Sequence, residues 1–301
     1  MPDSAVTAVV LSWNRREDTL ACLRSLAAVT EPELKTIVVD NASDDGTVEA
    51  VRVEFPGVEL VVNDANLGFA EGNNVGIRRA LEAGAEWVLI LNNDVEVDPG
   101  FLSPLLEEAA RRPDVGALGP LILFGPPSET IWFAGARFDP RKGYNGRQRG
   151  YGEVADTRFD EVWETDRICG AAMLVPRAVL EEVGDFDTEL FAYYEDTDWS
   201  LRARTAGHGL YVVPAGRIWH KVSQSSGGES SPATLYYGTR NALVVCERAA
   251  PLGPVGTWRR RGVLLSAHLV QALLSGRRRE AVGAVLAGWR DFRAGRLGRR
   301  E

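Results

Sequence analysis

An apolar run ends abruptly in a polar triplet within the segment VLILNNDV at residues 88–95. A short apolar run with β-branched residues is typical of a strand buried on both faces of a parallel sheet. Asn92-Asn93-Asp94 would then lie at the carboxyl end of that strand, the edge where open α/β sheets bind ligands. Asp98-Pro99 follows and predicts that the next helix starts there. Alone, the triplet favours an ordinary strand-to-helix turn, so its function depends on the rest of the chain.

Strand-like and helix-like segments alternate through the first 123 residues. This alternation predicts βαβ units, a parallel sheet and right-handed crossovers. The expected strands span residues 5–11, 34–39, 58–62, 88–91 and 115–123, with helices between them, one starting near Thr47 and another closed by Gly84. Polar clusters at 12–14, 40–45 and 92–94 follow three of these strands and should converge on one crevice. The chain has neither a Gly-x-Gly-x-x-Gly after the first strand nor a P-loop motif, which weakens dinucleotide-redox and P-loop interpretations.

The second half of the chain is less regular. Residues 126–160 are rich in Gly and Arg, and we expect β-hairpins or a mobile loop there. Further expected elements are a strand at 171–175, a helix at 177–183 closed by Gly184, a helix ending at Gly207 and a strand at 209–213. Ser223 to Ser231 is small and polar, which makes it a candidate flexible lid.

The composition bounds the class of protein. With 301 residues, 45% hydrophobic and 25% charged, the chain is typical of a soluble globular protein, most simply one large α/β domain with an appendage. The three cysteines (Cys22, Cys169 and Cys246) are far apart, which argues against a disulfide framework or zinc site and fits a reducing compartment. We expect no signal peptide, and no apolar run reaches the roughly 18 residues of a membrane span.

The charge is distributed asymmetrically. From Trp258 onward, eleven Arg stand against three acidic residues, a net +8, whereas the preceding residues carry 23 basic and 39 acidic groups, a net −16. An acidic body with a basic tail is not typical of a duplex-binding protein, so nucleic acid is not expected as a partner. Residues 262–276 and 281–289 read as two basic amphipathic helices. They are suited to contact with an anionic membrane surface, and equally to packing on the catalytic domain or a second subunit.

A series of motifs carries a family resemblance: SWNR (12–15), VVDNASDDGT (38–47), NLGFAEGNN (66–74), LNNDV (91–95), GAAML (170–174), GDFD (184–187), YYEDTDWSLRAR (193–204) and His220. In this order, over residues 5–240, it resembles glycosyltransferase family 2, and within it the bacterial rhamnosyltransferase-like members. The resemblance implies the GT-A fold, a Rossmann-like, mostly parallel sheet flanked by helices, and inversion at the anomeric carbon. We therefore expect a catalytic domain at 1–248, with a nucleotide-sugar half at 1–123 and an acceptor half at 124–248, followed by C-terminal helices at 249–301.

The resemblance implies a divalent cation, Mg²⁺ or Mn²⁺, at the opening triplet. The family usually presents Asp-x-Asp there, but in this chain Asn92 takes the first acidic position, so only Asp94 remains to bind the metal directly. His220 is the expected second ligand, since some relatives complete the metal shell with a histidine and neutral imidazole is acceptable to Mn²⁺. A structural loop histidine is the alternative. His208 and His268 have no such setting.

Glu195-Asp196 forms a second acidic centre. The resemblance implies that Asp196 is the general base and that Glu195 binds or orients the acceptor, with a helix N-terminus stabilising the negative charge. The alternative is that Asp196 and Asp198 only cap and charge-balance a helix ending in Arg202 and Arg204.

The remaining expected site residues surround these centres. Asp40 would accept a hydrogen bond from the ring N–H of uracil or thymine, with the indole of Trp13 stacked on the base. The nucleotide-sugar site would further include Ser12, Asn14, Asn66, Gly68, Asn73, Asn92 and Asn93, with Gly72 beside them where close backbone approach is needed. Aromatic platforms for acceptor sugars would be Tyr194, Trp199 and Trp219, with Tyr193 beside them.

Together these features predict a metal-dependent inverting glycosyltransferase. Its donor would be a nucleoside-diphosphate sugar, with dTDP-rhamnose and UDP-sugars as candidates, and its acceptor a glycan or lipid-linked glycan of a cell-surface polysaccharide. We expect it in the cytoplasm, at the inner face of the cell membrane where the tail makes contact. Two rivals are a sugar-nucleotide pyrophosphorylase, which should carry a Gly-rich triphosphate loop that residues 12–16 do not resemble, and a catalytically weak sugar-nucleotide-binding scaffold.

Overall fold

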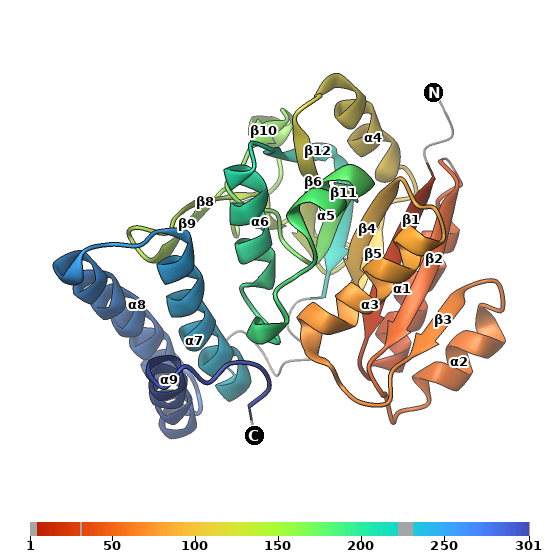
Figure 1. Ribbon diagram of the computed structural model, residues 1–301. Coiled ribbons are helices and arrows are strands. Elements are labelled where there is room, and N and C mark those ends of the chain that lie inside the picture. The colour runs from red at the N-terminus through yellow and green to blue at the C-terminus, as the bar shows by residue number, and fades with distance from the viewer. Residues whose placement is uncertain (1–4, 31, 222–230, 301) are drawn as a thin grey trace.

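The computed structural model describes residues 5–30, 32–221 and 231–300, with residues 144–147 described by their backbone. Its centre is a mixed, mostly parallel sheet with the strand order β10-β12-β6-β11-β4-β1-β2-β3 (Figure 1). The candidate lid at 223–231 lies outside the described residues except for Ser231.

The N-terminal half of the sheet is parallel. Its strands are β1 (Val6–Ser12), β2 (Leu34–Asp40), β3 (Glu59–Val62) and β4 (Trp87–Asn92). All seven residues of β1 are buried, as expected for an apolar strand covered on both faces. The strands predicted from the alternation are confirmed here to within a residue or two.

The connecting helices are α1 (Arg16–Ala27), α2 (Thr47–Glu54) and α3 (Gly68–Glu82). The strand order runs outward from β1 to β3 and then returns to β4 on the other side of β1. Right-handed crossovers therefore place α3 on the sheet face opposite α1 and α2. The carboxyl ends of β1 and β4 meet at the point where the winding reverses, which is where ligands bind in such sheets.

The second half extends the same sheet. β11 (Ala172–Pro176) is antiparallel to β4 and to β6 (Val115–Phe124), and β12 (Gly209–His220) is parallel to β6. The strand expected to end at Val213 resumes at Arg217 after an irregularity and reaches His220, because Pro214-Ala215-Gly216 forms a bulge rather than a strand end. The shorter strands are β5 (Val95–Val97), β7 (Ile131–Phe133) and β10 (Trp163–Glu164), and β8 (Ala136–Asp139) pairs with β9 (Tyr144–Gln148) as one of the expected hairpins.

The helices of this half are α4 (Leu102–Arg111), α5 (Arg177–Val183) and α6 (Glu195–Thr205), with short 3-10 turns at Thr157–Phe159 and Thr188–Leu190. The prediction that a helix begins at Asp98-Pro99 is wrong. Asp98 closes a turn instead: its carboxylate accepts the Gly100 N–H at 2.8 Å and its carbonyl accepts the Phe101 N–H at 3.0 Å. The Pro-Gly pair favours that turn, and the helix starts only after it.

Three helices complete the chain: α7 (Pro232–Ala249), α8 (Pro254–Leu274) and α9 (Arg278–Arg293). They pack on one another at the end of the molecule farthest from β3, with α8 on the outside (Figure 1). The last two are longer than the sequence pattern predicts. The predicted boundary at residue 248 falls at the end of α7, and the division into two domains stays a prediction.

Candidate active site

Three strand ends converge as the sequence predicts. Ser12, the last residue of β1, lies opposite Asp40 of β2, and Leu11 lies opposite Asn92 of β4. The Asn41 N–H donates to the Ser12 carbonyl at 2.8 Å, which ties the first two strand ends together. The candidate nucleotide residues therefore share one edge of the sheet.

The predicted base-binding residues differ in accessibility. Trp13 is 45% exposed, so its indole is available for stacking. Asp40 is fully buried, and its carboxylate accepts hydrogen bonds from the Ser43 N–H at 2.8 Å and the Ser43 hydroxyl at 2.5 Å. Each carboxylate oxygen can accept a further hydrogen bond, but because Asp40 is fully buried a nucleotide base can reach it only if the surrounding residues move. Asn14 fixes the same loop, since its side-chain oxygen accepts the Asp44 N–H at 2.9 Å.

The segment around α3 serves mainly to hold the site together. Asn66 accepts the Gly68 N–H at 2.8 Å. A Cβ at Gly68 would lie 2.5 Å from Phe191, and one at Gly72 would lie 2.6 Å from Leu11, so both glycines permit chain–chain packing rather than approach to a sugar. Asn73 is fully buried inside the helix and donates to the Phe69 carbonyl at 2.9 Å. Asn73 Oδ1 is buried without a hydrogen-bond partner among the described residues, and the expectation that Asn73 and Gly72 lie near the sugar stays a prediction.

The three residues of the polar triplet after β4 have different roles, since one supports the loop and two face His220. The amide of Asn93 donates to the Thr19 hydroxyl at 2.9 Å and to the Asn14 carbonyl at 3.3 Å, so this side chain holds the loop against α1. Asn92 is half-buried, with its Nδ2 3.5 Å from the His220 Nε2. Only Asn92 and Asp94 of the triplet thus face His220.

Asp94 and His220 are neighbours, although 126 positions separate them. Their Oδ1 and Nε2 atoms lie 3.0 Å apart, and both side chains are about 95% buried. Antiparallel pairing of β5 with β12 sets this contact, because His220 lies opposite Val95 and the Lys221 N–H donates to the Asp94 carbonyl. The ring of Trp132 packs edge-on against the imidazole, with ring centroids 4.4 Å apart, and fixes its orientation.

The pair fits a divalent cation. Burial raises the pKa of Asp94, but the adjacent His220 ring and the charge of Arg15 outweigh it and leave that pKa below its ordinary value, so the carboxylate is ionised. Asn92 Oδ1 is buried without a hydrogen-bond partner among the described residues, and so is Asp94 Oδ1 apart from its 3.0 Å contact with the His220 ring. A carboxylate and an imidazole are donor types that Mn²⁺ or Mg²⁺ accepts, and Asp94 and His220 are the residues that would hold such an ion. Within the described ranges, no group of three or more His, Cys, Asp or Glu side chains could hold a metal.

The second acidic centre lies at the start of α6. Asp196 Oδ2 accepts the Gly170 N–H at 3.0 Å and lies 3.6 Å from the guanidinium of Arg167. Asp196 thus reaches outside its own helix, whereas the expected charge-balancing pair is Asp198 with Arg202, at 2.8 Å. The capping alternative therefore applies to Asp198 and not to Asp196.

Of the predicted acceptor platforms, only Tyr194 keeps a suitable position, half-buried directly before Glu195. Trp199 is 1% exposed and its indole N–H donates to the Gly184 carbonyl at 2.8 Å, so it is a core residue with no face for a sugar. Trp219 precedes His220 on β12, so its side chain points to the opposite face of the sheet, where the indole donates to the Ser128 carbonyl. Tyr193 is half-buried and its hydroxyl bonds to Thr234 at 2.9 Å.

Several residues at the site were not predicted from the sequence. Arg167 beside Asp196 lies in a loop and Trp132 beside His220 in the short strand β7; neither belongs to a motif, and no sequence signal marks them. Arg15 is different: it belongs to the SWNR motif and adopts the left-handed conformation (φ 65°), so the motif could have flagged it.

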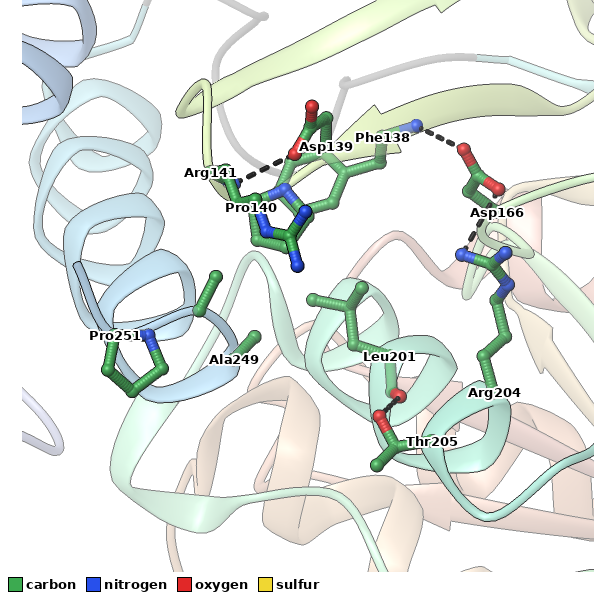
Figure 2. Close-up of a pocket in the computed structure, with 11 residues that line it drawn as sticks. Phe138, Asp139, Pro140, Arg141, Asp166, Leu201, Arg204, Thr205, Ala249 and Pro251 are labelled. Atoms are coloured by element: carbon green, nitrogen blue, oxygen red, sulfur yellow. Dashed lines mark hydrogen bonds and ion pairs between the residues drawn. The ribbon is translucent and has the colours of Figure 1, made fainter. Parts of the chain in front are cut away.

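A large open cavity of about 740 Å³ lies away from this site. It is found where the β8–β9 turn, the carboxyl end of α6 and the α7–α8 connection meet (Figure 2). Its charged side chains are largely satisfied by protein partners, as in the contact of Arg204 with Asp166 at 3.1 Å. The cavity is therefore a gap between packed elements, and the candidate active site is the edge of the sheet where the strands end.

Comparison with known proteins agrees with this geometry. The family model described as Glycosyl transferase family 2 matches residues 7–184, more than half of the chain. The chain belongs to glycosyltransferase family 2. A glycosyltransferase is thereby favoured over a pyrophosphorylase or a non-catalytic scaffold.

Two relatives extend the match in this glycosyltransferase beyond the family model. The chain is 30% identical over 285 residues to the N-acetylglucosaminyl-diphospho-decaprenol L-rhamnosyltransferase of Mycobacterium tuberculosis, covering 86% of this chain and 91% of that protein. It is 24% identical over 253 residues to the dTDP-rhamnosyl transferase RfbF of Shigella flexneri, covering 82% and 81%. The resemblance to rhamnosyltransferase-like members is thus confirmed.

Solved structures confirm the GT-A fold. The mannosyltransferase of Pyrobaculum calidifontis in complex with GDP-Man and Mn²⁺ superposes with a TM-score of 0.59 at 20% identity, covering 96% of this chain and 75% of that one. Residues 1–349 of S. aureus TarS in complex with UDP-GlcNAc superpose with a TM-score of 0.53 at 17% identity, covering 97% and 92%.

Proposed function

We propose that this glycosyltransferase is metal-dependent and inverting, and that it transfers a sugar from a nucleoside-diphosphate sugar to a hydroxyl group of a lipid-linked glycan. We favour dTDP-rhamnose as donor because relatives at 30% and 24% identity are named for rhamnosyl transfer, with a UDP-sugar as the alternative. The observation that carries the proposal is the contact of Asp94 with His220 at 3.0 Å, at the edge where the strand winding reverses.

The two acidic centres divide the work. Asp94 and His220 would hold Mn²⁺ or Mg²⁺, which as a Lewis acid would neutralise the departing diphosphate. Two protein ligands suffice, since such cations commonly take their other ligands from substrate phosphates and water. Trp13 would stack on the base, and Asp40 would bind its ring N–H.

Asp196 would act as the general base. Inversion requires the acceptor oxygen to attack from the face opposite the leaving group, and Asp196 would take the hydroxyl proton as the new C–O bond forms and the diphosphate leaves. The Gly170 N–H binds Oδ2, whereas Oδ1 accepts a hydrogen bond from the adjacent Thr197 hydroxyl at 3.1 Å and has a second lone pair for the acceptor hydroxyl. Glu195 would orient the acceptor.

We also propose that the protein works at the inner face of the cell membrane, with the outer side of α8 in contact with lipid. Of the described residues, none belongs to a helix long and apolar enough to cross a bilayer. The outward side of α8 instead carries a stripe of exposed apolar residues at helical spacing: Val255 (84%), Trp258 (74%), Val263 (41%), Val270 (56%), Leu273 (54%) and Leu274 (80%). We call this set the α8 stripe.

The charges around the α8 stripe suit an anionic surface. The helix contains no acidic residue, and exposed Arg259 and Arg277–Arg279 lie at its two ends. Arg260 and Arg261 serve the fold instead: Arg260 is 2% exposed and donates to the Ala250 carbonyl, and Arg261 pairs with Glu247. Exposed arginines beside an apolar face are typical of helices that lie in the membrane interface.

The experiment on the proposed chemistry compares three variants with the wild type. Each is tested for sugar transfer from a panel of dTDP- and UDP-sugars, with and without Mn²⁺. Binding of the corresponding nucleoside diphosphates is measured by calorimetry. His220→Ala should lose the Mn²⁺-dependent part of nucleotide binding, because the second metal ligand is gone. Asp196→Asn should keep nucleotide binding and lose turnover by a factor of about 10² to 10⁴, the usual contribution of a positioned base.

His208→Ala is the matched control, since this histidine also adjoins a strand of the sheet but pairs with Glu182, at 3.0 Å, away from the candidate metal site. It should behave like the wild type. Nucleotide binding by the wild type that is indifferent to Mn²⁺, or full turnover in Asp196→Asn, would contradict the proposal.

A further inference from the structure

The loop that leads into the catalytic helix has an unusual backbone. Phe191, Tyr193 and Tyr194 all have positive φ (63°, 68° and 73°), although none is glycine. Phe191, with ψ −59°, is the centre of a γ-turn in which the Ala192 N–H donates to the Leu190 carbonyl at 2.8 Å. Turns of this hand are rare and strained, and such backbone persists only where the surroundings fix it.

Two side chains of α7 supply that fixation. Arg240 and Asn241 are both fully buried. The Asn241 amide donates to the carbonyls of Leu190 (2.8 Å), Ala192 (2.8 Å) and Tyr193 (2.7 Å). Arg240 donates to the Leu190 carbonyl at 3.0 Å and to the Asn241 side-chain oxygen at 2.9 Å, which orients the amide.

On its other side, the same loop is hydrogen-bonded to the nucleotide-sugar half of the chain. The Phe191 carbonyl accepts the N–H groups of Phe69 (2.7 Å) and Ala70 (3.1 Å), at the start of α3. Gly68 has no room for a Cβ because Phe191 occupies that space. The loop thus spans from α3 to α7 and ends at Glu195-Asp196, so its shape sets where the two carboxylates lie.

We propose that Arg240 and Asn241 are positioning residues for the transfer reaction, and that they hold the strained 189–194 loop in the shape that places Asp196 opposite the donor. The C-terminal helices would then be part of the catalytic machinery. The Arg240 guanidinium also donates to the Gly298 carbonyl at 2.7 Å, and the Gly298 N–H donates to the Glu189 carbonyl at 2.6 Å, so the end of the chain closes on the same loop. This inference rests on the proposed role of Asp196.

The test uses Asn241→Asp in the full-length protein. The substitution keeps the shape of the side chain and an acceptor for Arg240, but it replaces the donating amide with an oxygen that faces three carbonyls. Turnover should fall at least about 100-fold, since a misplacement of about 1 Å at a catalytic group has that effect, while nucleotide affinity should stay close to wild type. Thr239→Val is the matched control, because this buried hydroxyl donates to the Leu235 carbonyl of its own helix and makes no hydrogen bond to the 189–194 loop.

A structural role and a positioning role are separated by a double-mutant cycle. If Asn241 acts through Asp196, adding Asn241→Asp to Asp196→Asn should cause little further loss, whereas independent effects would multiply. Arg240→Lys, which keeps the charge but not the fork, serves as the second variant if Asn241→Asp does not fold.

A measurement that does not depend on sugar transfer distinguishes a failure of the positioning proposal from a failure of the proposed function. Amide hydrogen exchange at 191–198 should be at least tenfold faster in Asn241→Asp than in the wild type, with the amides of α7 unchanged. Unchanged exchange with unchanged turnover would overturn the positioning role. Faster exchange in a protein whose wild type transfers no sugar would instead overturn the proposed function.

Discussion

Glu195 and Asp196 are adjacent in sequence, but their carboxyl groups lie in different environments. Asp196 is half-buried and held by the Gly170 N–H. Glu195 is 5% exposed, and its Oε2 has no hydrogen-bond partner in the part of the chain that the structure describes. Burial, and then the charge of Asp196, raise the pKa of Glu195 to about 8. Glu195 is therefore protonated at neutral pH and able to donate a hydrogen bond, while Asp196 accepts one.

The raised pKa of Glu195 predicts how stability depends on pH. From its ordinary value of 4.5 up to about 8, the folded protein keeps a proton that the unfolded chain has released, so stability falls as pH rises through this window. The loss is at most about 1.4 kcal/mol per pH unit. Glu195→Gln cannot ionise, so its free energy of unfolding, measured by urea titration, should gain on the wild type as pH increases. Parallel stability curves for the two proteins would contradict the raised pKa.

At the scale of elements, the contact of α3 with the sheet is unusually close. A Cβ at Gly76 would lie 2.2 Å from Val9 Cγ1 and 2.9 Å from Val39 Cγ2. Both valines are fully buried, and their branched side chains have little freedom to move aside. Glycine at position 76 therefore lets α3, the helix that begins at Gly68, pack closely against β1 and β2.

Gly76→Ala should therefore destabilise the protein, although alanine is the better helix former. Overpacking in a filled core costs about 1–3 kcal/mol, more than the gain of about 1 kcal/mol from helix propensity. Gly283→Ala is the matched control: this α9 glycine is exposed with no atom near the added Cβ, so it should stabilise by up to about 1 kcal/mol. Thermal unfolding of both variants measures the difference, and a stable Gly76→Ala would mean that α3 can shift from the sheet.

At the scale of the whole molecule, the acidic body and the basic tail occupy different regions. The sheet begins with β3 at one end of the molecule, and α8 lies on the outside at the other (Figure 1). Between them, α7 carries the two buried side chains that hold the catalytic loop. A membrane bound along α8 would thus be in contact with the helical layer that also shapes the acceptor side of the site.

The membrane contact is tested by flotation with vesicles of phosphatidylcholine with and without phosphatidylglycerol. The wild type should float with the anionic vesicles, and less as salt rises, because arginine attraction is screened. Val270→Asp combined with Leu274→Asp places charge on the α8 stripe and should abolish flotation. Val53→Asp, on an exposed valine of α2 (84%), is the control and should float normally.

The alternative occupant of the α8 stripe is a second copy of the chain. Light scattering of the wild type and the double variant separates the two. If the wild type is a dimer, the variant is a monomer, and both bind vesicles alike, the stripe is a subunit interface and the membrane proposal is wrong.

The sequence by itself determined the order of strands and helices in the first half, because each apolar run is short, continuous and bounded by turn formers. It also determined that Ser12, Asp40 and Asn92 share one edge, since parallel strands end together. The series of motifs was sufficient to indicate the family. Local patterns failed where one residue can serve two purposes: Asp98 could start a helix or close a turn, and Trp199 could bind a sugar or fill the core.

Only the tertiary structure decided which distant side chains meet. His220 reaches Asp94 because β12 continues through a bulge and pairs with β5, a two-strand contact that no local pattern contains. Arg167 contacts Asp196, and Asn241 contacts the 189–194 loop. In both cases the partners are far apart in the sequence, and their spacing does not predict the contact. Burial is likewise a property of the packed molecule: the removal of water, together with the nearby charge of Asp196, raises the pKa of Glu195, and no local pattern shows which side chain the fold buries.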